Sequence, residues 1–418
     1  MRQLSLMKEA ESRHDYHRSR EQQEVSLTLV RLRALAEGLV GDHLPLDETL
    51  RLSFDESSKL PRVLFVTSNG AGMGHLTRCM AIARSGRESF QSHFVSLASS
   101  AAIVNSLGFE VLKFPSQKAS SGISHREWND RFSEFFDAVC RANRPDAIVF
   151  DGTWIYRGIH ESARRHGIKM IWLRRGLWHD GASTAQIKDS KSIVDHLLVP
   201  FDIAAEADTG PVSRSEGTQV NAATLTTPAD STDRDRAIQD LGLDPRRRYV
   251  LVQLGAGVIN DINDLRELVI SEVLKRSPEV DIVLGLSPLS PDYEDVRLRV
   301  HVLRKYPIAD YLQAFDFMVI AAGYNSVHES VRFTTPAIVI PNLETLTDNQ
   351  SLRASEFERL GYGLAAITRQ EIISALSRML TDSELQTFRK SLESSVRSDI
   401  DSGEDAAQVI KDWLSSNG

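Results

Sequence analysis

The sequence predicts an α/β chain with two parallel β-sheets. Three observations support this fold class: short apolar segments alternate with segments of helical periodicity, the alternation forms two successive series, and each series contains a glycine-rich turn directly after an apolar segment. Parallel strands need a crossover between them, usually a helix, and strands buried on both faces are apolar along their whole length. Each series is therefore expected to fold as one sheet covered by helices.

The first series occupies residues 61–203, and the second occupies residues 237–400. Strands of the first series are predicted at 63–66, 93–97, 110–114, 147–150, 170–173 and 197–199. Strands of the second series are predicted at 249–254, 281–284, 299–303, 317–321 and 337–340. Between the two series, residues 204–236 are rich in Gly, Pro, Ser, Thr and Asp, which indicates a linker or surface loop.

The two ends of the chain differ from the sheet-forming series. Residues 1–60 begin with a stretch of mixed charge to about residue 24, which we expect to be disordered, and continue with a predicted helix. The apolar stripe of that helix is Val25, Leu29, Leu32, Ala36 and Leu39. The stripe either packs on the main fold, which we favour, or lies on a partner or a membrane surface. Residues 401–418 predict a C-terminal helix that packs on one of the two domains.

Composition and charge narrow the functional classes. The chain has 418 residues, 41% of them hydrophobic, and a formal net charge of −8, which gives no general attraction for nucleic acid. The two cysteines, Cys79 and Cys140, allow no disulfide framework and indicate a reducing compartment, so we expect a cytoplasmic protein. No apolar run is long enough to span a membrane, while contact with a membrane surface is left open.

A glycine turn with a histidine follows the first predicted strand. Residues 69–75, Asn-Gly-Ala-Gly-Met-Gly-His, lead directly into a predicted helix. Glycines let main-chain N–H groups approach a phosphate or a hydroxyl, and His75 adds a group that titrates near neutral pH. The spacing is neither the dinucleotide fingerprint nor a phosphate-binding loop that ends in Gly-Lys-Ser/Thr. The alternative is a purely structural strand-to-helix turn.

Three charged residues end later strands of the first series. Asp151 follows the strand at 147–150 on the sheet edge where His75 is expected, so it either orients that imidazole or caps a loop. Arg174 and Arg175 close the strand at 170–173. We expect this pair to contact a phosphate, the alternative being ordinary surface arginines.

The second series contains, in order, a strand, a glycine turn, a helix with a carboxylate, another strand and a polar cluster. Gly323 and Ser326 at a helix N-terminus suit a diphosphate, and Glu329, one turn further, can accept hydrogen bonds from both ribose hydroxyls. The polar cluster offers donors and acceptors for the hydroxyls of a sugar and consists of Asp348, Asn349 and Gln350. Taken singly, the carboxylate has the alternative of an ion-paired helix residue, and the two amides that of a helix cap.

The segment from about 306 to 363 resembles the C-terminal domain of family 28 glycosyltransferases, and the turn at 70–75 resembles the acceptor loop of the same group. This group contains the peptidoglycan lipid-intermediate N-acetylglucosaminyltransferase and the diacylglycerol galactosyltransferases. The resemblance covers about residues 61–400. It implies the GT-B fold, in which two Rossmann-like domains face each other across a cleft, here preceded by an N-terminal helical extension.

The resemblance also implies roles for individual residues. Glu329 would bind the ribose, the cluster at 348–350 would hold the donor sugar, and Ile308 would meet the uracil through its backbone. Residues implied near the diphosphate are Gly255, Gly257, Gly323, Asn325 and Ser326. Residues implied on the acceptor side are Gly72, Gly74 and Arg78, to which we add Arg174 and Arg175. Ala256 stands where the lipid-intermediate enzyme usually has a serine, so the acceptor is not identified by this resemblance.

The implied reaction is the transfer of a hexose or an N-acetylhexosamine from a UDP-sugar to an acceptor hydroxyl, with inversion at the anomeric carbon. His75 is the expected general base, supported by Asp151. The UDP-sugar is a co-substrate, and we expect no cofactor and no metal ion, because the D-x-D pattern at 233–235 lies in the predicted linker. A UDP-sugar 2-epimerase and a non-catalytic nucleotide-sugar-binding protein remain as alternatives. The acceptor, the donor sugar and the oligomeric state are left open.

Overall fold

A computed structural model describes residues 50–68, 73–117, 120, 122–212, 217–255, 263–286, 293–395 and 397–417. Residues Leu52–Gly418 form one compact unit. Several predictions lie outside the described residues: the disordered stretch and helix before residue 50, most of the first glycine turn with Gly72, and Gly257.

The first sheet contains seven parallel strands in the order β3-β2-β1-β4-β5-β6-β7. Its strands are β1 (Arg62–Thr67), β2 (Gln91–Ser96), β3 (Val111–Lys113), β4 (Ala147–Asp151), β5 (Lys169–Leu173), β6 (His196–Pro200) and β7 (Thr218–Val220). Its helices are α3 (Gly74–Ser85), η1 (Ala101–Leu107), α4 (His125–Asn143), α5 (Arg157–His166), α6 (Ala185–Lys188) and α7 (Ser190–Ile193). We refer to these elements as the first half.

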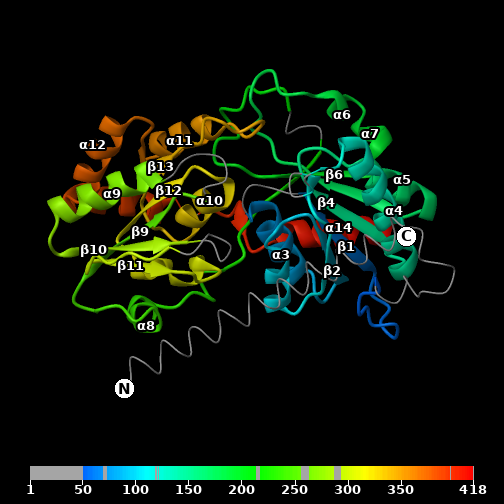
Figure 1. Cartoon of the computed structure of the whole chain (residues 1–418), viewed down its shortest axis with the longest axis horizontal. Coiled ribbons are helices and arrows are strands. Elements are labelled where there is room, and N and C mark those ends of the chain that lie inside the picture. The colour runs from blue at the N-terminus through cyan, green and yellow to red at the C-terminus, as the bar shows by residue number, and fades with distance from the viewer. Residues whose placement is uncertain are drawn as a thin grey trace. The chain divides into compact units, whose positions relative to one another are not determined.

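The second sheet contains six parallel strands in the order β11-β10-β9-β12-β13-β14. Its strands are β9 (Arg248–Gln253), β10 (Val280–Gly285), β11 (Val300–Leu303), β12 (Phe317–Ala321), β13 (Ala337–Ile340) and β14 (Gly363–Ala365). Its helices are α8 (Arg234–Asp240), α9 (Asn263–Arg276), η4 (Ile308–Ala314), α10 (Tyr324–Arg332), α11 (Gln350–Arg359), α12 (Arg369–Met379) and α13 (Asp382–Ser394). We refer to these elements as the second half (Figure 1).

The central strands are buried from end to end, which explains why apolar runs predicted them. In β1 every residue after Arg62 is buried, and all of β4 and β13 is buried. Burial of such side chains is the main favourable term in folding, at about 25 cal/mol per Å² of apolar surface. The predicted linker differs from a plain loop: it contains β7, the short strand β8 (Ala222–Ala223) and the start of α8. These strands have only two or three residues, too few to show an apolar alternation in the sequence.

The six strands of the second sheet have the same order as the first six strands of the first sheet, and that order determines where ligands can bind. In the first half, β2 and β3 lie on one side of β1, and the chain then crosses to the other side with β4. In the second half, β10 and β11 lie on one side of β9, and the chain then crosses to the other side with β12. In open parallel sheets such a switch leaves a crevice at the carboxyl ends of the strands. The turns from β1 to α3 and from β12 to α10 both begin at these ends.

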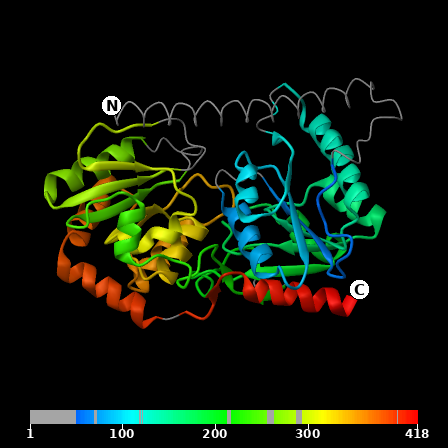
Figure 2. The same cartoon turned by 90° about the horizontal axis from the view of Figure 1, so that it is seen from below.

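The C-terminal helix α14 (Glu404–Asn417) returns to the first half after the second half is complete. Figures 1 and 2 show this helix alongside the elements of the first half. Its buried residues join the same apolar core as β1 and α3; they are Ala406, Ala407, Ile410 and Leu414. Just before the helix, β15 (Ile400–Asp401) pairs with β8, so the two segments that connect the halves lie together.

A substitution at Gly403, the residue before α14, tests whether this helix packs closely on the first half. Its φ is +94°, and a Cβ there would lie 2.7 Å from the backbone N and Cα of Ile82 in α3. Gly242 has a φ of +68° with open space around it. In thermal or urea unfolding, Gly403→Ala should cost roughly 2–5 kcal/mol, because strain and clash add, and Gly242→Ala roughly 1–2 kcal/mol from the backbone alone. Equal losses in the two variants would show that α14 does not pack closely on α3.

Candidate active site

His75 and Asp151 form a hydrogen-bonded pair in the first half. Thr67 at the end of β1 is aligned with Asp151 at the end of β4, and His75 lies on the first turn of α3. The Nδ1 atom of His75 lies 2.7 Å from Oδ1 of Asp151. An ionised carboxylate only accepts hydrogen bonds, so Nδ1 carries the hydrogen and Nε2 is left as the basic atom. The side chain of His75 is 17% exposed and that of Asp151 is 1% exposed.

Arg78 holds the other side of the same carboxylate. Its Nε lies 2.9 Å from Oδ2 of Asp151 and its Nη2 lies 2.8 Å from Oδ1. Burial would raise the pKa of Asp151, but the charge of Arg78 and the contact with His75 outweigh it and lower this pKa below its usual value. We expected Arg78 on the acceptor loop, whereas its guanidinium is 1% exposed and turned toward Asp151, because a buried charge needs a partner. Arg78 is therefore not placed to touch an acceptor.

The loop after β5 joins the first half to the polar cluster of the second. Trp178 forms an isolated antiparallel bridge with Asp348. The backbone N–H of His179 donates to the carbonyl of Thr347 at 2.8 Å, and that of Asn349 donates to the carbonyl of Leu177 at 2.8 Å. Leu177 has a φ of +59°, a conformation that non-glycine residues seldom adopt and that is often found at functional sites. The predicted sugar-binding cluster is thus held by main-chain contacts from the other half.

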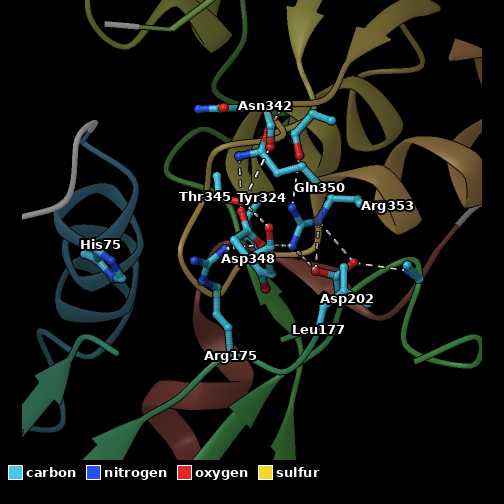
Figure 3. A network of polar contacts seen from close by, with 12 residues as sticks. His75, Arg175, Leu177, Asp202, Tyr324, Asn342, Thr345, Asp348, Gln350 and Arg353 are labelled. Carbon is cyan, nitrogen blue, oxygen red and sulfur yellow. Dashed lines mark hydrogen bonds and ion pairs between the residues drawn. The ribbon is translucent and has the colours of Figure 1, made fainter. Parts of the chain in front are cut away.

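Asp348 lies between two arginines, one from each half. Its Oδ1 is 2.7 Å from Nη2 of Arg353 on α11 and 3.3 Å from Nη1 of Arg175 after β5. Arg353 is fully buried and also binds Asp202, which follows β6, at 2.8 Å. Burial alone would raise the pKa of Asp348, but the charges of Arg353 and Arg175 hold it well below its usual range. Figure 3 shows this network, with His75 beside it on its own helix.

The ring of Tyr324 lies at the centre of these charges. Tyr324 is the first residue of α10 and is 4% exposed. Three guanidinium carbons lie near its ring centroid: Arg78 at 4.8 Å, Arg175 at 5.5 Å and Arg353 at 5.8 Å. Its hydroxyl donates to the carbonyl of Phe201 at 2.7 Å. Cations are attracted to an aromatic face, so the ring stabilises three charges that would otherwise repel one another.

Residues from both halves line one pocket. The first half contributes His75, Asp151, Gly152, Thr153, Arg174, Arg175, Gly176 and Trp178, and the second half contributes Thr347 and Asp348. The structure therefore brings together five residues that the sequence singled out for three roles: the base pair, the arginine pair and the first member of the sugar cluster. Arg174 is 0% exposed and has its guanidinium 5.4 Å from the ring of Trp172.

The amides of the polar cluster already have partners within the second half. Asn349 caps α11, with its side-chain oxygen accepting from the N–H of Leu352 at 3.0 Å. Gln350 accepts from the N–H of Asn342 at 3.0 Å and donates to Asp348 at 3.2 Å. Asn349 thus acts as a helix cap in this structure, which is the alternative that the sequence left open. Gln350 holds the loop that carries Asp348 through its two hydrogen bonds.

The predicted diphosphate and ribose residues gather around the start of α10. Gly323 is the residue before the helix, Ser326 lies on its first turn, and Asn325 donates to the carbonyl of Gly74 at 3.3 Å. Glu329 lies one turn further, and burial together with nearby Asp310 raises its pKa to about 8.

The remaining predicted residues lie at element ends. Ile308 begins η4, directly after Tyr306 and Pro307. The hydroxyl of Tyr306 lies 2.7 Å from Oγ1 of Thr77, another contact between the halves. Gly255 follows β9 with a φ of +90°, and a Cβ added at Gly255 or Gly74 would meet open space.

Asp233, the first residue of the D-x-D pattern, caps a helix. Asp233 precedes α8, and its side chain accepts from the N–H of Arg236 at 2.9 Å, which is a helix cap. Within the part of the chain that the structure describes, no group of three or more His, Cys, Asp and Glu residues is arranged to hold a metal ion. Among the same described residues, no helix is both long and apolar enough to cross a membrane.

Comparison with known proteins supports the relationship suggested by the sequence. Residues 282–408 match the family model described as the glycosyltransferase family 28 C-terminal domain. The match runs from β10 into the start of α14. This match includes α10 and the polar cluster, and it confirms the resemblance that the sequence indicated.

Curated relatives match part of the chain. One from Clostridioides difficile, named UDP-N-acetylglucosamine–N-acetylmuramyl-(pentapeptide) pyrophosphoryl-undecaprenol N-acetylglucosamine transferase, is 27% identical over 159 residues, or 36% of this chain. A protein of the same name from Alkaliphilus metalliredigens is 25% identical over 171 residues, or 38% of this chain. The chain spans 39% and 45% of the lengths of these two relatives.

Solved structures extend the likeness to the fold of both halves. The spinosyn forosaminyltransferase SpnP aligns with a TM-score of 0.60 at 13% identity, covering 85% of this chain and 99% of that one. MurG from Acinetobacter baumannii aligns with a TM-score of 0.54 at 13% identity, covering 85% of this chain and 100% of that one. The predicted GT-B fold is confirmed by these alignments.

The buried pairing of Arg353 gives a stability prediction. Arg353→Met would leave Asp202 and Asp348 without their main counter-charge and should cost roughly 3–5 kcal/mol in urea unfolding at neutral pH. Arg359→Met on the same helix removes a 60% exposed arginine paired with Glu356 and should leave the free energy of unfolding almost unchanged.

The deficit of Arg353→Met should also depend on pH. Arg353 lowers the pKa of both aspartates, so its contribution is present above their unfolded pKa and is lost as the pH falls. The difference from the unaltered protein should therefore shrink below about pH 4. A deficit that stays as large below about pH 4 as it is at pH 7 would contradict the electrostatic account.

Proposed function

We propose that this protein is an inverting glycosyltransferase that moves a hexose or an N-acetylhexosamine from a UDP-sugar to an acceptor hydroxyl. The observation that carries the proposal is the shared pocket, in which the His75–Asp151 pair of the first half lies with Asp348 of the second. A base and a sugar-holding residue in one pocket are what a direct displacement requires. The family 28 match and the glycosyltransferase neighbours favour this activity over an epimerase or a non-catalytic binding protein.

His75 would take the proton from the acceptor. Asp151 accepts the hydrogen of Nδ1, which leaves Nε2 to accept the hydroxyl proton as the oxygen attacks the anomeric carbon. The bond from that carbon to the UDP oxygen breaks on the opposite face, so the configuration inverts. Ionised Asp151 stabilises the imidazolium that forms, since its pKa is lowered.

The second half would hold the donor. The N-terminus of α10, with Gly323 and Ser326, offers N–H groups to a diphosphate, and Glu329 would accept hydrogen bonds from the ribose hydroxyls. Arg175, which reaches the pocket from the first half, supplies positive charge for the leaving diphosphate. Asp348 would accept a hydrogen bond from a hydroxyl of the sugar.

The donor and acceptor are proposed from the relatives. Their name specifies UDP-N-acetylglucosamine as the donor and a pyrophosphoryl-undecaprenol-linked acceptor, so UDP-N-acetylglucosamine is the first donor to test here. Such an acceptor would place the protein at the surface of a membrane, in a cytoplasmic, peripheral location. We further propose that the reaction uses no cofactor and no metal ion.

A panel of UDP-sugars tests the function. The protein should bind UDP and release it from at least one UDP-sugar when an acceptor is present, with unchanged turnover in EDTA. Conversion of the donor without any acceptor would identify an epimerase instead. Binding of UDP without turnover on a broad acceptor panel would leave only a binding protein, and loss of turnover in EDTA with recovery in manganese would overturn the metal-free proposal.

Glu329 gives a pH-dependent prediction for UDP. Its pKa of about 8 means that the unliganded side chain mostly keeps its proton at neutral pH. The ribose hydroxyls are best accepted by the ionised form, so UDP affinity measured by calorimetry should rise as the pH increases from 7 to 9. Glu329→Gln should remove this rise and cost on the order of 1–3 kcal/mol of binding free energy at pH 9.

The thermal stability of Glu329→Gln provides an internal control for this prediction. A carboxyl whose folded pKa is raised contributes stability that is lost as the pH increases through that pKa. Glu329→Gln removes this loss, so at pH 9 the variant should unfold at an equal or higher temperature. A stable variant with the UDP affinity and pH dependence of the unaltered protein would exclude Glu329 from the ribose site.

His75 gives the catalytic prediction. His75→Ala should lower kcat by roughly 10²–10⁴-fold and leave UDP affinity unchanged, because the donor is held by the other half. Asp151→Asn should also reduce kcat, but by a smaller factor, because it removes the charge that stabilises the imidazolium and keeps the base itself. His125→Ala, on the exposed first turn of α4, serves as the matched control and should have no effect. Near-normal kcat with a raised acceptor KM in His75→Ala would make His75 an acceptor ligand.

A further inference from the structure

We propose that Arg78 is a positioning residue with two contacts. It fixes the carboxylate of Asp151 against His75, and it contacts Tyr324 at the start of α10, the helix proposed to bind the donor. It thereby determines the position of the candidate base relative to that helix. The inference rests on the proposed function of His75. Arg78 lies one helical turn after His75 on α3, so the two side chains share a face of the helix.

The first observation is the geometry at Asp151. Arg78 uses two nitrogens, Nε and Nη2, on the two carboxylate oxygens, at 2.9 Å and 2.8 Å. This fork fixes the plane of the carboxylate, because a rotation of the carboxylate would break at least one of the two bonds. Oδ1 then points at Nδ1 of His75, at 2.7 Å. A fixed carboxylate holds the ring in one orientation and one tautomer.

The second observation is the contact of Arg78 with the other half. Its guanidinium carbon lies 4.8 Å from the ring centroid of Tyr324, the residue that opens α10. Two more contacts join α3 to the second half beside it: Asn325 to the carbonyl of Gly74, and Tyr306 to Thr77. The start of α3, which carries His75, therefore contacts α10, the helix whose N-terminus is proposed to bind the diphosphate.

The third observation is the charge environment. Asp151 is faced by His75, Arg78 and the thiol of Cys79, all on α3, with the Cys79 sulfur at 3.8 Å. Arg78 is faced in addition by Tyr324, around whose ring Arg175 and Arg353 also lie.

Among these groups Arg78 is the charge that contacts Asp151 through both oxygens. Burial raises the pKa of Asp151, and without the charge of Arg78 this pKa would be higher than it is in the unaltered protein. A neutral Asp151 would no longer stabilise an imidazolium at His75.

The experiment compares Arg78→Met and Arg78→Lys in the full chain. In Arg78→Met, the carboxyl carbon of Asp151, followed by ¹³C NMR and assigned with Asp151→Asn, should titrate at a higher pH than in the unaltered protein, because the lowering charge of Arg78 is gone. The kcat should fall at least 10-fold while the donor KM stays unchanged, because the carboxylate no longer fixes the ring of His75. Lysine keeps the charge but not the fork, so Arg78→Lys should keep the low titration of Asp151 and still lose kcat.

Arg299→Met is the matched control, because Arg299 donates to the carbonyls of Leu274, Ser277 and Val280 in the second half, away from the pocket. It should leave the Asp151 titration and the kcat profile unchanged. An Arg78→Lys enzyme with unaltered kcat, or an Arg78→Met protein whose Asp151 titrates as in the unaltered protein, would overturn the proposal. The NMR titration needs no turnover, so it tests the role of Arg78 even if the proposed function fails. If Arg78→Met does not fold, Arg78→Lys carries the test through kcat.

Discussion

The contact of three arginines with the ring of Tyr324 is the interaction on which the candidate site depends. Each arginine also binds a carboxylate: Arg78 binds Asp151, while Arg175 and Arg353 both bind Asp348. Like charges so close together are stable only because the carboxylates and the aromatic face compensate them. Since these residues come from both halves of the chain, the same contacts that satisfy the charges also hold the candidate base and the loop proposed to bind the sugar in one pocket.

This arrangement explains why the polar cluster is held by backbone contacts from the first half. Asp348 can meet Arg175 only if the loop after β5 stays close, and the bridge between Trp178 and Asp348 keeps it there. The positive φ of Leu177 shows that the loop accepts a strained conformation to make these bonds. The pocket is therefore preorganised, which is how a protein lowers the cost of aligning donor, acceptor and base.

Much of the fold and half of this site could be predicted from the sequence. Buried parallel strands are apolar runs, and His75 with Asp151 follows from two adjacent strands that end at one sheet edge. Tyr324 and Arg353 were missed because their partners are distant in sequence, and periodicity carries no information about long-range pairing. Arg78 offered a signal: it lies among Thr77, Cys79 and Met80, and an arginine within such a buried stretch needs a carboxylate. The capping role of Asn349 was one of two interpretations that the sequence could not separate.

The most direct test of the account is a crystal structure with UDP and an unreactive sugar analogue. The account predicts the diphosphate at the N-terminus of α10, the ribose at Glu329 and the anomeric carbon in the pocket lined by His75 and Asp348. The nucleotide bound in the first half, or a sugar directed away from His75, would contradict it.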